Sequence, residues 1–125
     1  MTTTLRIEIF SADLDATVDF YTRVFGFTLE RDQRDGSPGY VALERDRVRI
    51  GVAYRDVPER QPGRRPPSGT EIVLEVDDLD TEHARVVAAG WPIEEGLTDR
   101  EWGLRDFRVL DPSGYYLRLT SQDRP

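Results

Sequence analysis

The feature of this sequence that most constrains its fold is an internal repeat. A stretch with alternating apolar residues, an Asp-Leu-Asp triplet and an amphipathic helical pattern ending at glycine follow one another twice. The first copy comprises Leu5–Phe10, Asp13–Asp15 and a helix ending at Gly26, and the second comprises Glu71–Val76, Asp78–Asp80 and a helix ending at Gly90. Asp13 and Asp78 are suited to cap the two helices, because a carboxylate accepts hydrogen bonds from free backbone N–H groups there.

Three short strands are predicted after each helix, separated by glycine, proline and aspartate turns. The predicted strands are 27–34, 40–45 and 48–54 in the first half, and 93–96, 105–110 and 115–120 in the second. The stretch between the halves is rich in proline and indicates a linker. The sequence therefore predicts an α+β fold in one domain, with tandem βαβββ modules forming a curved mixed sheet with a central groove. Module one covers about 5–54, the linker 55–69 and module two 70–120.

Strand alternation assigns side chains to the two faces of each module. The side chains predicted to face the helices are Leu5, Ile7, Ile9, Ile72, Leu74, Val76, Tyr115, Leu117 and Leu119. The side chains predicted to face the groove are Arg6, Glu8, Phe10, Glu71, Val73, Glu75, Tyr116, Arg118 and Thr120. His83 falls on the helical stripe and is expected to be a packing residue. The predicted groove is lined with arginines, glutamates and aromatic residues.

Composition excludes several classes of function. The chain has 125 residues, a net charge of −7, one histidine and no cysteine, and all 17 of its basic residues are arginine. Disulfides, zinc–thiolate sites, iron–sulfur clusters, multi-histidine metal sites within one chain and lysine Schiff bases are therefore excluded. The acidic balance disfavours nucleic-acid binding. No apolar run approaches the ~20 residues of a membrane span, and the N-terminus lacks the apolar stretch of a signal peptide. We expect a cytoplasmic protein with neither nucleic acid nor membrane as partner.

The ordered motifs resemble the vicinal oxygen chelate superfamily, which includes glyoxalase I, extradiol dioxygenases, fosfomycin-modifying enzymes and bleomycin-resistance proteins. The residues that carry the resemblance are Asp13–Asp15, Phe20-Tyr21, Phe25–Phe27, Glu75–Asp80, Ala88–Gly90, Trp102-Gly103 and Asp111–Gly114. The resemblance covers about residues 5–120 and implies the tandem fold and a homodimer. Exposed sheet edges in such a fold also favour symmetric pairing.

The resemblance also implies where a metal would bind. In metal-dependent members, the first strand of each module offers a His or Glu and the last strand offers a Glu. The matching positions here are Arg6, Arg49, Glu71 and Arg118. A guanidinium group has no lone pair to donate to a metal. We therefore expect no metal and no cofactor.

Two functions remain open. The first is a metal-free protein resembling bleomycin-resistance proteins, which binds a small organic ligand or antibiotic in the groove. Its predicted ligand-binding residues are Arg6, Glu8, Arg49, Glu71, Trp102, Tyr116 and Arg118, with no catalytic residue. The second is a glyoxalase- or dioxygenase-like enzyme, either a metal-dependent lyase or oxygenase, or a metal-free isomerase or hydrolase using Glu8 or Glu71. The arginines could hold a ligand's carboxylate, phosphate or carbonyl group, or could form cross-strand ion pairs in the place of a metal.

Overall fold

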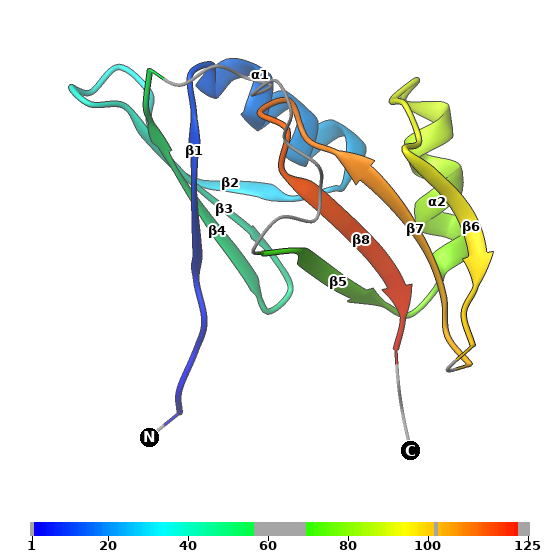
Figure 1. The fold of residues 1–125 in the computed structure, drawn as a ribbon. Helices are drawn as coiled ribbons and strands as arrows, with labels where there is room; N and C mark the ends of the chain where they lie inside the picture. Colours follow the sequence, from blue (N-terminus) through cyan, green and yellow to red (C-terminus); the bar gives the residue numbers. More distant parts are fainter. Residues whose placement is uncertain (1, 57–69, 102, 123–125) are drawn as a thin grey trace. The chain divides into compact units, whose positions relative to one another are not determined.

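The computed structural model describes residues 2–56, 70–101 and 103–122. The chain divides into two compact units, Met1–Glu59 and Arg60–Pro125. Each unit has one helical segment and four strands in the order βαβββ (Figure 1). The α+β class and the tandem modules predicted from the repeat are confirmed. No helix in the described part of the chain is long and apolar enough to cross a membrane.

Unit one is a four-stranded mixed sheet with the strand order β1-β4-β3-β2. Its elements are β1 (Ile7–Ser11), α1 (Leu14–Asp19), the π-helical turn η1 (Phe20–Val24), β2 (Thr28–Gln33), β3 (Tyr40–Arg45) and β4 (Val48–Tyr54). β1 runs parallel to β4, and the other neighbouring strands are antiparallel. The first and last strands of the module are therefore neighbours in the sheet.

Unit two repeats this topology with the strand order β5-β8-β7-β6. Its elements are β5 (Ile72–Val76), α2 (Leu79–Ala88), β6 (Glu95–Asp99), β7 (Arg105–Leu110) and β8 (Tyr116–Ser121). β5 runs parallel to β8, as β1 does to β4. Each helix packs on one face of its own sheet, so the opposite face of each sheet is open. We call this second surface the open face of the unit.

The helix boundaries follow the predicted local chemistry. The Asp13 carboxylate accepts a hydrogen bond from the Ala16 N–H at 3.0 Å, and Asp78 accepts one from Thr81 N–H at 3.1 Å. Each helical segment is followed by a glycine with positive φ, at Gly26 (69°) and Gly90 (73°). Glycine adopts this conformation without the steric cost that a side chain imposes.

The core of unit one is built around aromatic residues at the C-terminal end of its helical segment. Phe20, Tyr21 and Phe25 are fully buried, and the Phe20 ring meets the rings of Tyr21 and Phe25 edge-on at centroid distances of 4.9 and 5.4 Å. A π-helical turn adds one residue to the helical register. This turn spans Phe20–Val24, and its Phe20, Tyr21 and Val24 are all buried.

The predicted faces hold for β5 and for most of β8. Ile72, Leu74, Val76, Leu117 and Leu119 are buried. Thr120 is predicted to face the groove and to be exposed. In the structure it is buried, and its hydroxyl donates to the Arg105 carbonyl at 3.2 Å.

Three predictions at strand ends are wrong. Leu5 is 74% exposed rather than packed on the helix, because β1 begins only at Ile7. β6 begins at Glu95 and not at Ile93, and Tyr115 precedes β8 and is half-buried. His83 is half-buried, with its ring edge-on to Phe107 at 5.1 Å, as expected for a packing residue.

Candidate functional site

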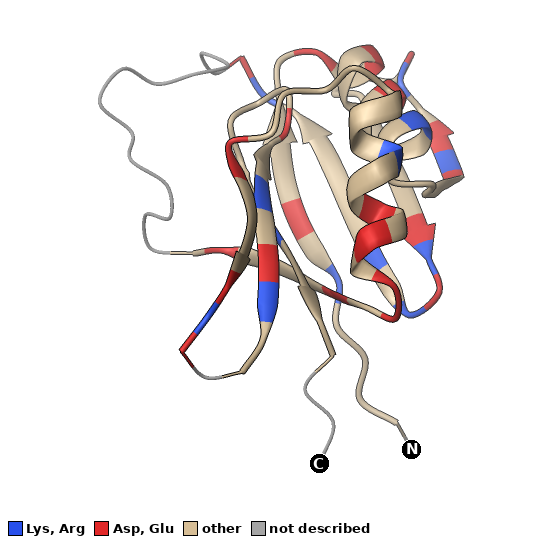
Figure 2. Ribbon diagram, turned by 90° about the vertical axis from the view of Figure 1, so that its right-hand side faces the viewer, with Lys and Arg blue, Asp and Glu red and all other residues tan. Residues whose placement is uncertain are grey.

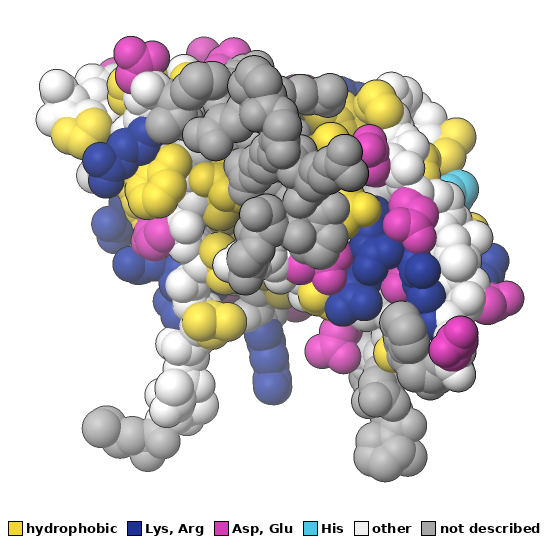
Figure 3. Space-filling view, in the orientation of Figure 1, with side chains coloured by type: hydrophobic (Ala, Val, Ile, Leu, Met, Phe, Trp, Pro, Cys, Tyr) yellow, Lys and Arg dark blue, Asp and Glu magenta, His cyan; other side chains and the backbone are white. Residues whose placement is uncertain are grey.

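The open face of unit two carries a closed ring of alternating charges. Glu71 directly precedes β5, Glu95 begins β6, and Arg100 directly follows β6. Asp106 and Arg108 lie on β7, and Arg118 lies on β8. Together these residues form what we call the charged ring, in the order Glu71, Arg108, Glu95, Arg100, Asp106 and Arg118. In Figure 3, arginine and carboxylate side chains lie side by side over β7 and β8.

Glu71 joins two arginines on neighbouring strands. Its Oε2 accepts a hydrogen bond from Arg108 Nε at 3.1 Å, and its Oε1 lies 3.2 Å from Arg118 Nε. Arg108 and Arg118 are directly opposite in the β7–β8 pairing. Like charges so placed repel each other, and the Glu71 carboxylate between them offsets that repulsion.

Arg100 closes the other side of the charged ring. Its Nη2 and Nε donate to Asp106 Oδ1 at 2.8 and 3.0 Å, and it also forms a short ion pair with Glu95. Glu95 accepts a second bond from Arg108 Nη1 at 2.9 Å. Arg118 Nη1 completes the ring 3.8 Å from Asp106 Oδ2.

The charged ring combines three arginines with three carboxylates, so their formal charges cancel. The hydrogen bond from Arg100 lowers the pKa of Glu95, with a further contribution from Arg108. The hydrogen bond to Asp106 raises the pKa of Arg100. The Asp106 side chain is only 1% exposed, so its charge depends on its arginine partners for stability.

Arg118 is the least firmly held member of the charged ring. Its Nε is buried and, among the described residues, has no hydrogen-bond partner of good geometry. Its side chain is still 25% exposed. The exposed part of this guanidinium can therefore meet a polar group from solution.

Tyr116 lies next to the charged ring on β8. The guanidinium carbon of Arg108 is 5.7 Å from the centroid of its ring, a distance within the range of cation–π attraction. Burial raises the pKa of the Tyr116 hydroxyl, and the positive charge of Arg108 opposes that effect. The tyrosine stays neutral at physiological pH and adds an aromatic surface to the open face.

The open face of unit one carries a smaller polar cluster around Glu8. Arg6 Nε lies 2.7 Å from Glu8 Oε1, and the Tyr40 hydroxyl donates to the same carboxylate at 2.9 and 3.2 Å. A Cβ atom at Gly51 would lie only 2.1 Å from the Tyr40 hydroxyl oxygen and 2.4 Å from Glu8 Oε2. A side chain at position 51 would therefore push the ends of Tyr40 and Glu8 aside where they cross β4. Burial, followed by the hydrogen bond to Glu8, raises the pKa of Tyr40.

A cavity of about 390 Å³ lies on the same part of unit one. Its charged and aromatic lining residues are Arg6, Glu30, Arg31, Tyr40, Glu44 and Arg49. Arg49 Nη2 donates to the Thr4 hydroxyl at 2.8 Å. A hydrogen bond with Glu30 raises the pKa of Glu44, because two carboxylates share this site. Unit one thus offers open space beside arginines.

The strand registers correct one match made from the sequence. Ile7 pairs with Ile50 in unit one, and its repeat counterpart Ile72 pairs with Leu117 in unit two. Counting one residue onward makes Gly51 the counterpart of Arg118. Arg49 instead corresponds to Tyr116, so the sequence-based match of Arg49 with Arg118 is wrong by two residues.

The residues present do not fit the metal site of the family's metal-dependent members. Arg6, Arg49 and Arg118 carry no lone pair for a metal, and Gly51, the corrected counterpart of Arg118, has no side-chain donor. Both oxygens of Glu71 are engaged by arginines. Within the described ranges, no group of three or more His, Asp or Glu side chains could hold a metal ion.

The structure divides the predicted site residues between the two units. Arg6, Glu8 and Arg49 belong to the open face of unit one, and Glu71, Tyr116 and Arg118 to that of unit two. Trp102 lies outside the described residues.

Sequence reasoning missed Tyr40 and the ring members Glu95, Arg100, Asp106 and Arg108. A signal for two of them was present, because Asp106 and Arg108 alternate with the buried Phe107 and Val109 on β7. Their side chains must point to the open face.

The fold has two repeated modules with polar open faces. The amino-acid sequence matches a protein-family model over residues 3–119. The chain belongs to the Glyoxalase/Bleomycin resistance protein/Dioxygenase superfamily. A search of curated protein sequences finds no significant match.

Solved structures of the same fold include proteins of different kinds. TioX from Micromonospora sp. ML1 is 28% identical, with a TM-score of 0.77, over 96% of this chain and 98% of that one. A bleomycin resistance determinant encoded on transposon Tn5 is 23% identical, with a TM-score of 0.75, over 98% and 100%. A lactoylglutathione lyase from Agrobacterium tumefaciens is 20% identical, with a TM-score of 0.70, over 97% and 94%. The last two likenesses show the fold alone, because one fold can serve unrelated functions.

Proposed function

We propose that this protein binds a small organic molecule without a metal, in the manner of a bleomycin-resistance protein. The observation that carries this proposal is the chemistry at the family's metal positions. Two of these positions hold Arg6 and Arg118, and a third holds Gly51. The remaining carboxylate, Glu71, is held between Arg108 and Arg118. Such a surface repels a divalent cation and suits a ligand with hydrogen-bond acceptors.

The ligand enters the cavity on the open face of unit one. Its volume of about 390 Å³ lies within the roughly 300–1,000 Å³ of small-molecule pockets. Arg6, Arg31 and Arg49 bring three positive charges to its lining, against two from Glu30 and Glu44. A carboxylate or polarised carbonyl on the ligand is the group that these arginines recognise best.

The enzymatic alternative receives less support from the contacts. Glu8 already pairs with Arg6 and accepts from Tyr40. Glu71 already pairs with Arg108 and Arg118. A general base must be within hydrogen-bond reach of the proton that it takes from the substrate. Both carboxylates already form contacts with groups of the protein.

A thermal-shift screen of antibiotics, glutathione adducts and aromatic acids tests the proposal, since a ligand that binds the native state raises the melting temperature. We expect the stabilisation by a hit to persist in excess EDTA. Stoichiometric Zn, Ni, Mn or Fe after purification without chelators would contradict the metal-free proposal, as would loss of binding in EDTA.

Substitutions then locate the site. Arg49→Met and, separately, Arg6→Met should each weaken a discovered ligand by about 2 kcal/mol, because both arginines line the cavity. Arg23→Met is the matched control, because Arg23 lies on η1 and forms an exposed ion pair with Asp19. If binding survives both test substitutions at wild-type strength, the site is elsewhere.

We also propose that the protein is a homodimer. β1 and β2 are the edge strands of one sheet and β5 and β6 those of the other, and exposed edges favour pairing with a second copy. Light scattering at micromolar concentration should give about twice the chain mass of 14.3 kDa. A particle of the single-chain mass would contradict this proposal.

A further inference from the structure

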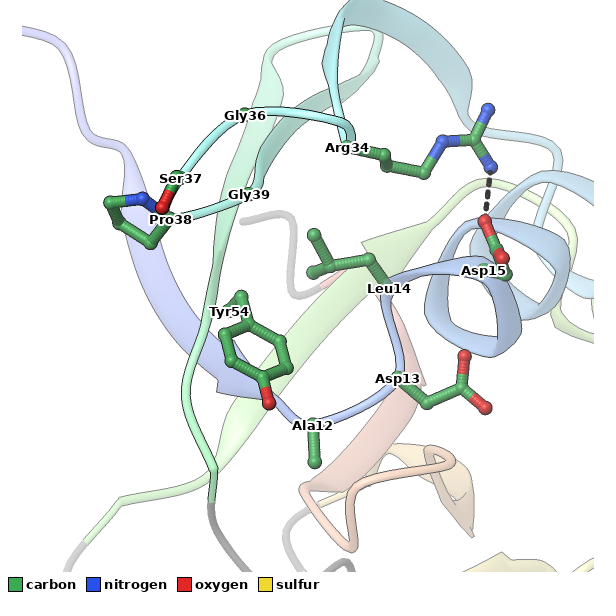
Figure 4. A pocket seen from close by; sticks show the side chains of 10 residues that line it. All are labelled: Ala12, Asp13, Leu14, Asp15, Arg34, Gly36, Ser37, Pro38, Gly39 and Tyr54. Atoms are coloured by element: carbon green, nitrogen blue, oxygen red, sulfur yellow. Dashed lines mark hydrogen bonds and ion pairs between the residues drawn. The ribbon is translucent and has the colours of Figure 1, made fainter.

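A second cavity of unit one shares no residue with the one on the open face. Its volume is about 660 Å³, and it lies where the β1–α1 connection, the β2–β3 loop and the end of β4 meet (Figure 4). Its side chains come from Ala12, Asp13, Leu14, Asp15, Arg34, Ser37, Pro38 and Tyr54, with Gly36 and Gly39 completing the lining. The volume suits a small organic molecule.

Close contacts hold the β2–β3 loop, which forms one side of this cavity. A Cβ atom at Gly39 would lie 2.9 Å from Leu14 Cδ1 and 2.9 Å from the Arg34 carbonyl oxygen, so only glycine allows the loop to pack so closely on Leu14. The Tyr54 N–H donates to the Gly39 carbonyl at 2.9 Å, which ties the loop to β4. The cavity is therefore shaped before any ligand arrives, which lowers the entropic cost of binding.

The charged side chains that line this cavity each have a hydrogen-bond partner within the protein. Arg34 binds Asp32 through Nε and Nη2 at 2.9 and 2.7 Å and Asp15 through Nη1 at 3.1 Å. Asp13 caps α1 through the Ala16 N–H. Figure 4 shows Arg34 extending toward Asp15, away from Ser37 and Pro38. An anionic ligand would find no uncommitted arginine among the lining residues.

The lining of the cavity also has an apolar and aromatic part. The Leu14 side chain extends beneath the loop with the Tyr54 ring beside it (Figure 4), and Pro38 adds another ring to the lining. Tyr54 is 42% exposed although it is a large aromatic residue. An aromatic face of this kind favours stacking with another planar ring.

We propose that this cavity is a second binding site, which takes a neutral planar aromatic compound against Tyr54 and Leu14. It is independent of the proposed ligand site on the open face, because the two cavities have no lining residue in common. Burial of the ligand's aromatic ring drives binding. Backbone groups of the β2–β3 loop form hydrogen bonds with the polar substituent of the ligand.

Three probes of nearly equal shape and different charge test the proposal: benzamide, benzoate and benzamidinium. Each is titrated into the full ¹⁵N-labelled chain, and amide chemical shifts are followed by NMR. We expect benzamide to shift the amides of residues 12–15, 34–37 and 54 saturably, in the millimolar range expected of a fragment. Benzoate and benzamidinium should bind these residues at least about threefold more weakly, because they lose solvation without gaining a partner.

Substitution of Tyr54 then separates stacking from unspecific adsorption. Tyr54→Ala should weaken benzamide about threefold to tenfold, whereas Tyr54→Phe should keep its affinity within about twofold. Val87→Ala is the control, because Val87 is also an exposed apolar residue, at 56%, but lies on α2. Circular dichroism verifies that each variant is folded.

Three results would overturn the proposal. The first is shifts that do not saturate or that spread over the whole chain. The second is unchanged benzamide affinity in folded Tyr54→Ala, and the third is tighter binding of either charged probe at these residues. Shifts caused by benzoate around Arg6 and Arg49 would instead report on the open face and would leave this test unaffected.

Discussion

The two modules have the same topology and the same pairing of first and last strands, but the side chains on their open faces differ. Positions that carry charge in unit two carry small or neutral residues in unit one. The counterparts, with unit one first, are Gly51 and Arg118, Ala42 and Arg108, and Tyr40 and Asp106. Unit two fills its open face with the charged ring, whereas unit one leaves a cavity of about 390 Å³. The repeat thus conserves the scaffold while the side chains of three paired positions decide whether the face is filled or open.

A glutamate in the second strand of each module shows how the electrostatics of the two open faces differ. Glu30 and Glu95 each lie at the irregularity of the second strand of their module. Glu95 meets Arg100 and Arg108, which lower its pKa. Glu30 is unpaired in the sheet, between Leu29 and Arg31, and forms its hydrogen bond with Glu44, whose pKa rises. The carboxylate in unit two therefore meets arginines, whereas the one in unit one meets a like charge.

An arginine directly after the second strand shows the effect of a one-residue offset. Arg34 follows β2 and Arg100 follows β6, but the pairings of Gln33 with Tyr40 and of Thr98 with Asp106 make Arg34 the counterpart of Asp99. A shift by one residue turns a side chain to the opposite face. Arg34 accordingly reaches Asp15 of α1, while Arg100 joins the charged ring.

The largest expected effect comes from removing Asp106 from the charged ring. Asp106→Leu removes a buried carboxylate that pairs with both Arg100 and Arg118, and we expect a loss of about 3 kcal/mol in the free energy of unfolding. Urea denaturation measures this loss. The control is Asp32→Asn, which breaks an exposed pair with Arg34 and should have a much smaller effect, because water screens exposed charges. Equal effects of the two substitutions would contradict a special role for the ring.

A smaller effect is expected from adding a methyl group to unit one. Gly51→Ala pushes aside Tyr40 and Glu8, and because both are side-chain ends that can move, the cost should be about 1 kcal/mol. The pKa of Tyr40 should fall toward its ordinary value, since burial and the Glu8 contact that raise it would both weaken. Ultraviolet titration of the phenolate measures this change.

The same substitution at a glycine of unit two is the control for Gly51→Ala, because it also reduces the freedom of the backbone. Gly96→Ala in β6 adds a Cβ that meets nothing within 4 Å, so the stability should change little or rise slightly. Tyr40→Phe should also reduce the cost of Gly51→Ala, because it removes the nearest clashing atom. A full cost of Gly51→Ala in the Tyr40→Phe background would refute this explanation.

The smallest expected effects concern pH and should have opposite signs in the two units. The folded state lowers the pKa of Glu95 below 4.5, so its contribution is present above that pH and is lost as the pH falls. The folded state raises the pKa of Glu44 above 4.5, so its unfavourable contribution is present at neutral pH and disappears on acidification. Glu95→Gln should therefore lower stability at pH 7 by less than about 1 kcal/mol, while Glu44→Gln should raise it. Urea midpoints at pH 7 and at acidic pH test both signs, and a destabilising Glu44→Gln would contradict the shared-carboxylate explanation.

Much of the fold could be predicted because its signals are local. The caps at Asp13 and Asp78 and the helix ends at Gly26 and Gly90 follow from single residues and their neighbours. The failures occur at strand ends, as at Leu5, where the limit of a strand depends on how far its neighbour extends.

The candidate site could be predicted only in part. The proximity of Glu71 and Arg118 follows from their place on the open face of two strands, and ion pairing between them was one of two open explanations. The contribution of Arg108, Glu95 and Arg100 could not be predicted, because it requires knowing which strands are neighbours and in which register.

The sequence by itself determined the repeated βαβββ order, the two capped helices and the alternation of apolar and polar faces. Together with the family resemblance, it also indicated that guanidinium groups stand at positions where metal-dependent members have ligands. Only the tertiary structure decided that Gly51, and not Arg49, corresponds to Arg118, and that six charged side chains close into a ring. The physical reason is range: alternation and capping act between residues a few positions apart, whereas the register of paired strands joins residues far apart in the chain.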